Sequence, residues 1–550
     1  MAIIYLFFRV NKLSLIIFLG LIIISHIPHN YNRVSTAKIV KINAKSYIAQ
    51  TYHYNILVIT KKKLNFGDQI SFNEKLLDHM TITDDLFGFD DENYYRSYNI
   101  KYKLITDDLM VKEHFDLKKI IYNKIINKNN YYKYFIFNIK DQNIDDDLLY
   151  ESGLGYYGLL FVVNKVLRIF LNEHKTKRYS ILFLALIAIF DNSYGLFRLI
   201  IYRLISLFIK DYKLSFAVAN IILMLLLPYK VFSLSFILPF ILGLVSIFRN
   251  KIFNKWLIVT LFSSLFFYQV NIIKIIFFQF HQSLKGLMYF LSFILIDHEG
   301  IYGWLIKYYR IFNHYLDLFI IRGNIGGLGI VVFIIITLIF KKFKFYQSSI
   351  LIIMIIFLNI GNLYPSISII NSGKNQSILI KDHFNSRTVL IDNSNIYNYE
   401  RLKRFMYAKG VNKIDQLIIK SNNQNNLHRL YNDFKIDKIT DNHSFDYQYL
   451  VVNNLNIFII NNKNTLKDLL QNYNLKIDIL VDINDKYDQY YEEVIKTLDP
   501  KIIISPKQQE LFEEYTIKKY ATKNHNIEFI FSKFHNIIKL NDGNFVIINP

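Results

Sequence analysis

The feature that most constrains this chain is a succession of apolar runs between residues 153 and 360. Runs of this kind predict helices that cross a bilayer. Apolar residues make up 52% of the chain, more than an ordinary soluble enzyme carries. The expected spans lie near residues 155–171, 180–190, 196–210, 214–227, 231–248, 257–279, 326–340 and 347–361. The sequence therefore predicts a polytopic α-helical membrane protein, with its membrane domain at 151–361.

Polar residues interrupt part of this region. The stretch 283–320 is largely apolar but contains Asp297, Glu299 and Asp317. It therefore predicts either two spans or a pair of re-entrant or interfacial helices. Several other runs are short for a hydrocarbon core of about 30 Å. Short, broken helices usually line a cavity rather than face lipid.

The flanking charges predict an orientation. An apolar run at 13–27 follows Arg9 and Lys12, and no small-residue cleavage pattern follows it, so residues 1–33 are expected to be an uncleaved membrane anchor. The basic loops at 175–178, 249–255 and 341–344 fall on the same side as this N-terminus. Basic loops favour the cytoplasmic face. We therefore expect a multi-pass protein of the cell membrane, with a cytoplasmic N-terminus and an extracellular C-terminal domain.

Two segments between the anchor and the apolar runs have a different pattern. Residues 34–111 alternate apolar and polar positions and contain a turn signal at 65–68, which predicts a small, five-stranded, extracellular β-barrel. Residues 112–150 form an amphipathic connector, whose basic helix at 116–128 either packs on the barrel or lies on a bilayer surface.

The C-terminal segment, 365–550, mixes strand and helix patterns and predicts a separate α/β domain. It shows no Ser-His-Asp spacing, Gly-rich phosphate loop or histidine pair with metal-ligand spacing. A cluster of acidic residues contains Asp482, Asp485 and Asp488. This cluster could bind a cation weakly, but a solvated acidic loop is the stronger interpretation. The absence of cysteine excludes disulfides and thiolate zinc sites. Strands are expected at 366–370, 377–381, 388–392, 416–420, 449–452, 457–460, 479–481 and 501–505, and helices at 399–408 and 490–498.

Basic side chains within the apolar runs indicate a partner. The net charge of +21 permits a nucleic acid or an anionic lipid surface, although AT-rich codon usage accounts for part of it. Arg198 and Arg203 are expected in a wet interior, because a charge at the bilayer centre costs about 2.5–3.5 kcal/mol. Other cations, including Lys165 and Lys230, snorkel to the headgroups. A cationic interior suits a polyanionic strand held through its phosphates.

Several short motifs together resemble one family, the ComEC competence channels, which bring single-stranded DNA across the bacterial cytoplasmic membrane. Residues 65–68 resemble the Gly-Asp turn of that family's oligonucleotide-binding (OB-like) barrel, and Arg198 falls at a family arginine. The further motif positions are Ser152, Gly153 and Leu154, with Gly155 in place of the family histidine, and Pro228 with Leu234, Ser235 and Phe236.

The resemblance also implies a metallo-β-lactamase-like fold for 365–550. Residues 389–392 match a strand end of that fold, but the metal motif falls on 420–426, where Ser421, Asn425 and Asn426 stand at ligand positions. Neutral hydroxyl and amide groups bind zinc poorly. The resemblance therefore implies a degenerate domain without metal, cofactor or hydrolase activity.

The predicted function is a membrane channel for uptake of single-stranded DNA during natural transformation, with Arg198 contacting phosphate and Arg203 as a weaker candidate. The resemblance implies a cytoplasmic motor helicase and an external DNA receptor as partners, besides the lipid bilayer and a homo-oligomer. Two alternatives stay open. One is an envelope metallo-hydrolase or nuclease with a divergent metal site. The other is a decayed structural membrane protein, which Gly155 and the lost ligands favour.

Overall fold

The computed structural model describes most of the chain in two compact units. The described residues are 34–42, 46–52, 54–79, 95–112, 117–125, 127–137, 139, 149, 152–191, 193–231, 233–248, 252–317, 319–324, 364–372, 375–392, 399–419, 424–441, 447–452, 455–460, 477–482, 500, 502–505, 518–521, 527–531, 536–539 and 545–548. The first unit comprises Met1–Thr83, Asp91–Ser263 and Asn271–Ile320, and the second comprises Asp84–Asp90, Ser264–Val270 and Ile321–Pro550.

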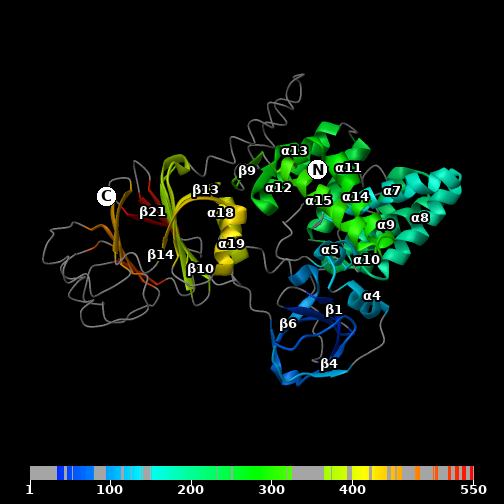
Figure 1. Cartoon of the computed structure of the whole chain (residues 1–550), viewed down its shortest axis with the longest axis horizontal. Coiled ribbons are helices and arrows are strands. Elements are labelled where there is room, and N and C mark those ends of the chain that lie inside the picture. Colours follow the sequence, from blue (N-terminus) through cyan, green and yellow to red (C-terminus); the bar gives the residue numbers. More distant parts are fainter. Residues whose placement is uncertain are drawn as a thin grey trace, which may run out of the picture. The chain divides into compact units, whose positions relative to one another are not determined.

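The first unit begins with a β module (Figure 1). Its elements are β1 (Thr36–Ile42), β2 (Tyr47–Gln50), β3 (Asn55–Ile59), β4 (Gln69–Ser71), η1 (Glu74–Leu76), β5 (Leu77–His79), β6 (Ile100–Ile105) and β7 (Met110–Lys112). They form one seven-stranded sheet in the order β5-β6-β3-β2-β1-β4-β7, rather than the expected five-stranded barrel. Ile100, Tyr102 and Leu104 alternate into the core because successive side chains of a strand point to opposite faces. The turn predicted at 65–68 is confirmed, since Asp68 Oδ2 accepts a hydrogen bond of 2.7 Å from the Asn65 amide.

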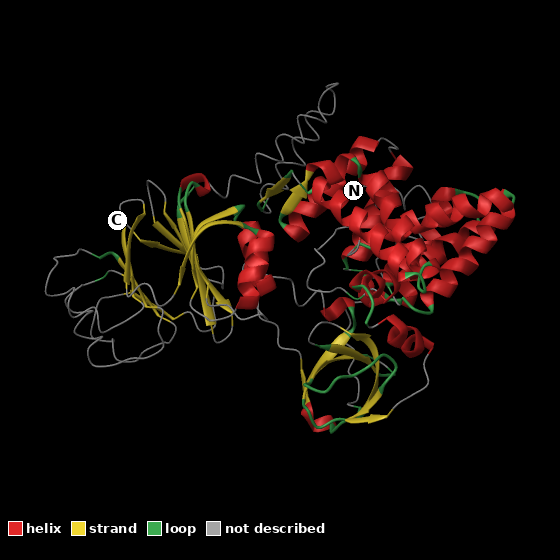
Figure 2. Ribbon diagram, in the orientation of Figure 1, coloured by secondary structure: helices red, strands yellow, loops and turns green. Residues whose placement is uncertain are grey.

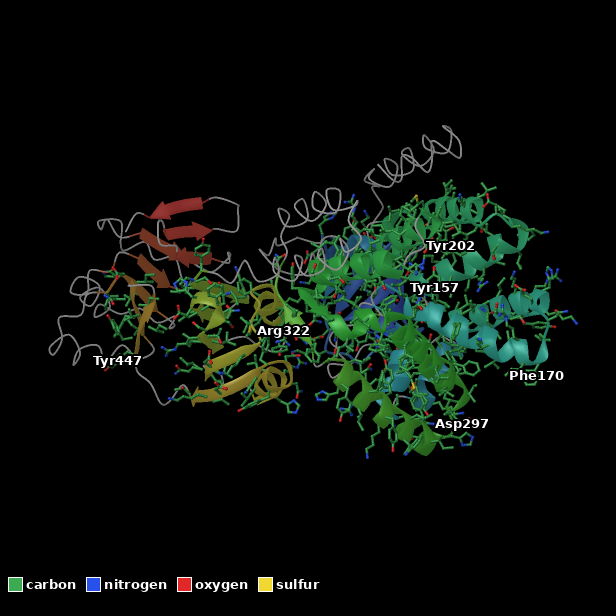
Figure 3. The ribbon with its side chains drawn as sticks, turned by 90° about the horizontal axis from the view of Figure 1, so that it is seen from above. Tyr157, Phe170, Tyr202, Asp297, Arg322 and Tyr447 are labelled. Carbon is green, nitrogen blue, oxygen red and sulfur yellow. The ribbon has the colours of Figure 1, made fainter. Side chains whose placement is uncertain are left out.

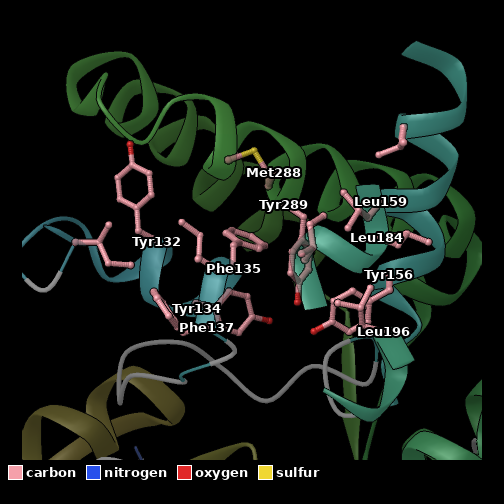
Figure 4. Packing of buried hydrophobic residues seen from close by; sticks show 14 of the residues in the cluster. Tyr132, Tyr134, Phe135, Phe137, Tyr156, Leu159, Leu184, Leu196, Met288 and Tyr289 are labelled. Atoms are coloured by element: carbon pink, nitrogen blue, oxygen red, sulfur yellow. The ribbon is translucent and has the colours of Figure 1, made fainter. Parts of the chain in front are cut away.

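The connector helix packs on this module. α4 (Leu117–Ile125) places Tyr122 against Phe66, with ring centroids 5.1 Å apart, and Lys119 pairs with Asp68 at 3.3 Å. Of the two interpretations of this helix, the structure therefore shows the packed one. The following helix, α5 (Asn130–Phe137), is buried through Tyr132, Phe135 and other aromatic residues against the helical region (Figure 4).

The helical region contains α7 (Gly155–Phe170), α8 (Glu173–Ala188), α9 (Tyr194–Phe208), α10 (Tyr212–Leu226), η2 (Pro228–Lys230), α11 (Leu234–Phe248), α12 (Ile252–Phe267), α13 (Ile272–Ile276), α14 (Phe278–Ile294) and α15 (Glu299–Leu316). Two short strands, β8 (Gln269–Asn271) and β9 (Ile320–Arg322), pair at its end. α7 and α14 cross closely because Gly158 and Gly286 meet there: a Cβ built on Gly286 would lie 2.0 Å from the carbonyl carbon of Gly158.

The predicted fold class, a polytopic membrane protein with an OB-like barrel and a metallo-β-lactamase-like domain, is contradicted. Over the described residues, no helix has both the length and the apolar composition needed to cross a membrane. Polar caps divide the apolar runs: Asn172, Ser193 and Asp211 each accept a hydrogen bond from the first turn of the helix that follows. α7 and α8 have 16 residues each. At 1.5 Å per residue such helices are about 24 Å long, against a hydrocarbon core of about 30 Å.

The remaining membrane predictions divide into two groups. α15 is the longest of the described helices, with 18 residues, but it carries Glu299, Lys307 and Arg310. The expected spans at 326–340 and 347–361 and the anchor at 1–33 lie outside the described residues. What the structure shows is a chain of mixed helices and sheets (Figure 2).

The second unit contains two mixed sheets, with α18 (Tyr399–Ala408) and α19 (Gln424–Asp433) beside the first (Figure 2). The eight-stranded sheet has the order β14-β13-β12-β11-β10-β20-β21-β22, and the five-stranded sheet has the order β15-β16-β17-β18-β19. Their bounds, with the short η4, are β10 (Ser366–Ser372), β11 (Asn375–Lys381), η4 (His383–Asn385), β12 (Thr388–Asp392), β13 (Lys413–Ile419), β14 (Lys435–Asp441), β15 (Tyr447–Val452), β16 (Leu455–Ile460), β17 (Ile479–Asp482), β18 (Ile502–Ser505), β19 (Lys518–Ala521), β20 (Ile527–Phe531), β21 (Asn536–Lys539) and β22 (Phe545–Ile548). All eight predicted strands and the helix predicted at 399–408 are confirmed, while 490–498 lies outside the described residues.

Candidate anion site in the helical region

Arg198 lies on the buried face of α9. Ser193 caps this helix by accepting a hydrogen bond from the Leu196 amide. Tyr194 and Arg198 are four residues apart, so they share one face of the helix. Arg198 is 0% exposed and Tyr194 is 7% exposed, although arginine is rarely buried without a partner.

The Arg198 guanidinium has few partners for a buried charge. One terminal nitrogen donates to the carbonyl oxygen of Ser235 at the start of α11. The guanidinium carbon lies 5.7 Å from the centre of the Tyr157 ring of α7. Within the described part of the chain, Arg198 Nε, its other terminal nitrogen and the Tyr194 hydroxyl are buried without a hydrogen-bond partner. Leaving such donors unsatisfied costs about 1–3 kcal/mol each, and more for a charged group.

Tyrosine side chains surround this arginine. Burial raises the pKa of Tyr194 well above its usual value, and the positive charge of Arg198 opposes that rise. Burial likewise raises the pKa of Tyr202, whose hydroxyl donates to Asn220 at 2.8 Å. Figure 3 labels Tyr157 and Tyr202 in this part of the helical region. The hydroxyls of Tyr194 and Tyr202 therefore stay protonated at neutral pH. The Tyr194 hydroxyl can donate a hydrogen bond to an incoming acceptor.

Residues 228–231 and 233–236 include the partner of Arg198, Ser235. The hydroxyls of Ser235 and Ser233 lie 2.9 Å apart, and Ser233 donates to the Lys230 carbonyl at 2.6 Å. These hydrogen bonds join the Ser235 hydroxyl, through Ser233, to the backbone carbonyl of Lys230, and they hold the backbone that presents the Ser235 carbonyl to Arg198. Phe236 is buried and stacks on Phe240 with ring centroids 5.6 Å apart. Pro228 begins η2, and Leu234 begins α11.

The motif at 152–154 supports α9 from the other side. Gly153 has a φ of +65°, and a Cβ built there would lie 2.6 Å from the Cα of Gly195. Ser152 is fully buried, and the Leu154 carbonyl accepts a hydrogen bond of 2.6 Å from Gln282 of α14. These residues therefore position the start of α9 rather than contact the guanidinium.

The nearby buried carboxyl group of Asp191 already has its own partners. Tyr156 donates to one of its oxygens, and the Ser193 amide donates to the other at 2.9 Å. Burial raises the pKa of Asp191 to about 6, and these hydrogen bonds oppose the rise. Figure 4 shows Tyr156 close to Leu196 of α9.

The other predicted site residues lie elsewhere. Arg203 is half-buried, about 140° around α9 from Arg198. Burial lowers its pKa, which Arg168 lowers further. Ser421 lies outside the described residues, whereas Asn425 and Asn426 lie on α19. Over the described ranges, no three His, Asp or Glu side chains are placed to hold a metal ion.

Sequence reasoning missed two residues of the site, Tyr157 and Tyr194. The signal that points to Tyr194 is its spacing of four residues before Arg198 on a helix capped by Ser193. Tyr157 lies on another helix, and the sequence carried no comparable signal for it.

Comparison with protein families, curated proteins and solved structures found no match to this chain. Nothing in these comparisons supports the ComEC competence assignment. The predicted fold of membrane-spanning helices is contradicted over the described residues, since none of their helices is long and apolar enough to cross a membrane.

Proposed function

We propose that this protein binds single-stranded DNA, and that Arg198 contacts a phosphate of the bound strand. The observation that carries the proposal is the buried guanidinium, which has two nitrogens without a partner among the described residues. A site that holds a desolvated positive charge together with unused donors favours an anion with several acceptor oxygens. The transport of DNA across a membrane is not part of this proposal.

The donor types of Arg198 and Tyr194 suit a phosphate diester. A guanidinium donates two parallel hydrogen bonds to phosphate oxygens, and the Tyr194 hydroxyl adds a third donor. These contacts carry no information about base sequence, so binding is expected to be independent of sequence. The net charge of +21 adds long-range attraction for a polyanion.

The test measures binding of a fluorescently labelled single-stranded oligonucleotide to the full chain by anisotropy. We expect Arg198→Met to weaken binding about 10- to 100-fold, since hydrogen bonds to a charged group contribute about 1.5–3 kcal/mol. The matched control is Arg178→Met, which removes the same charge from an exposed position of α8. We expect the control to bind within about twofold of the wild type.

Salt dependence identifies the contact as a phosphate contact. Loss of one phosphate contact lowers the slope of log K against log salt concentration by about 0.7 for a single strand. Arg198→Met should show this decrease. Equal affinities and slopes for Arg198→Met and Arg178→Met would overturn the proposal, because the site would then contribute only its net charge. Binding of inorganic phosphate to a protein that does not bind the oligonucleotide would also overturn the proposal.

A further inference from the structure

A second group of cations meets at one tyrosine ring of the first unit. Tyr98 lies in the turn before β6, and its carbonyl accepts a hydrogen bond of 2.6 Å from Asn55, which fixes the turn. Lys41 of β1 donates from Nζ to the Tyr98 hydroxyl at 3.0 Å and lies 4.6 Å from the ring centre. Lys230 of η2 places its Nζ 3.9 Å from the same ring centre. The β module and the helical region thus each contribute one amine to this ring.

Among the described residues, neither amine is balanced by a carboxylate. Of the residues that the structure describes, none forms an ion pair with Lys41 or Lys230. A single cation over a ring is a common stabilising contact, but a second ammonium on the same ring adds like-charge repulsion. Burial and, to a smaller extent, the charge of Lys41 lower the pKa of Lys230 to about 7. Charging Lys230 in the unbound protein therefore carries an electrostatic cost, which a bound anion would relieve.

The described groups around Lys230 supply no negative charge near pH 7. Of the titratable and charged groups in the described ranges, those shown beside Lys230 are Lys41 from β1, Tyr98 from the turn before β6 and Tyr229 from η2. Burial raises the pKa of Tyr229, so that tyrosine is neutral near pH 7. Along the sequence, Lys230 lies five residues before Ser235, whose backbone carbonyl accepts the hydrogen bond from Arg198.

We infer that Lys41 and Lys230 bind a second phosphate of the strand held by Arg198, and that Lys230 takes up a proton from solvent when the strand binds. This inference rests on the proposed function. The reaction balances as a neutral Lys230 amine plus one solvent proton giving an ammonium beside the phosphate. A phosphate between the two amines would place the strand where the β module meets the helical region of the first unit.

The consequence is a pH dependence with a definite sign. As pH falls through about 7, the amine becomes charged even in the free protein, so binding no longer requires proton uptake. Above that value, each strand that binds must protonate Lys230, and affinity falls as pH rises. Between pH 6.5 and 8.5 we expect the affinity of the wild type to fall by about tenfold or more.

The experiment titrates the full chain with a single-stranded oligonucleotide by calorimetry at pH 8, in buffers of different ionisation enthalpy. The wild type should take up about one proton more per bound strand than Lys230→Met. Lys230→Arg should keep strong binding at pH 8.5 but lose the proton uptake, because arginine is charged in both states. Lys210→Met, at an exposed position after α9, is the matched control and should behave as the wild type. Histidines can also take up protons when the strand binds, and this contribution cancels when the proton uptake of each variant is subtracted from that of the wild type.

The outcomes separate the two proposals. If Arg198→Met weakens binding but Lys230→Met leaves proton uptake unchanged, the inference is wrong and the proposed function stands. If the wild type binds no strand, the proposed function is wrong, and pyrophosphate is used as the probe for the lysine pair. Pyrophosphate binding with proton uptake that Lys230→Met removes would support the pair, and its absence would overturn it.

Discussion

Replacing Arg198 by methionine is expected to stabilise the free protein while it weakens DNA binding. Methionine has a similar length and no charge, so the change removes a desolvated cation without opening a large cavity. It loses the hydrogen bond to Ser235, about 1.5–3 kcal/mol, and the contact with the Tyr157 ring, about 2 kcal/mol when desolvated. It also removes a desolvation penalty of several kcal/mol and the unused donors.

The net change in unfolding free energy is taken from measurements on other buried charges. Replacing buried ionic groups by apolar residues of similar volume often stabilises proteins by about 1–4 kcal/mol. Because Arg198 does have one hydrogen bond and one ring contact, we expect the lower part of this range, about 1–2 kcal/mol. Arg178→Met should change the unfolding free energy by no more than about 0.5 kcal/mol, as usual for an exposed position.

Urea unfolding followed by tryptophan fluorescence measures this effect. Both tryptophans of the chain, Trp256 and Trp304, belong to the first unit. The stability advantage of the variant should shrink by about 1.3–2.3 kcal/mol when an oligonucleotide is added at about 100 times the wild-type Kd, because binding then stabilises the wild type by about 2.7 kcal/mol and the more weakly binding variant by only about 0.4–1.4 kcal/mol. A variant destabilised by about 3 kcal/mol or more without DNA would refute the reasoning. It would show that the guanidinium is paired and serves the structure alone.

Two further predictions concern the framework around the site. Burial raises the pKa of Asp191 to about 6 in the folded state, above the ordinary value of 3.8, so the folded protein holds the proton more tightly. The unfolding free energy should therefore fall by about 2 kcal/mol as pH rises from 4 to 6, and Asp191→Asn should remove this dependence in urea titrations across that range. Gly286→Ala places a Cβ about 2 Å from the backbone of Gly158, so it should lower the unfolding free energy by roughly 1–3 kcal/mol, whereas Gly303→Ala meets open space and should not. Equal unfolding free energies for the two alanine variants would contradict the close helix crossing.

Local patterns predicted some parts of the fold well. The turn at 65–68 depends on neighbouring residues alone, and the strands of the second unit follow from short apolar segments with clear boundaries. The helix expected at 399–408 coincides with α18 for the same reason. In each case the physical cause lies within the segment itself.

The apolar runs were misinterpreted because short apolar segments were counted as spans. The boundaries of the predicted segments at 155–171, 196–210 and 214–227 lie close to those of α7, α9 and α10, but these helices have only 15 or 16 residues and are too short to cross a bilayer. Arg198 could be identified as an interior cation because it stands within an apolar run. Its contacts with Tyr157 and Ser235 depend on how three helices pack, and no local pattern specifies that packing.

The most direct test of the central claim is the experimental structure of the full chain with a bound single-stranded oligonucleotide. We expect a phosphorus atom within roughly 4 Å of Arg198 Nε or its unused terminal nitrogen, with the Tyr194 hydroxyl turned toward the same phosphate. A strand bound elsewhere, with Arg198 still bonded only to Ser235, would contradict it.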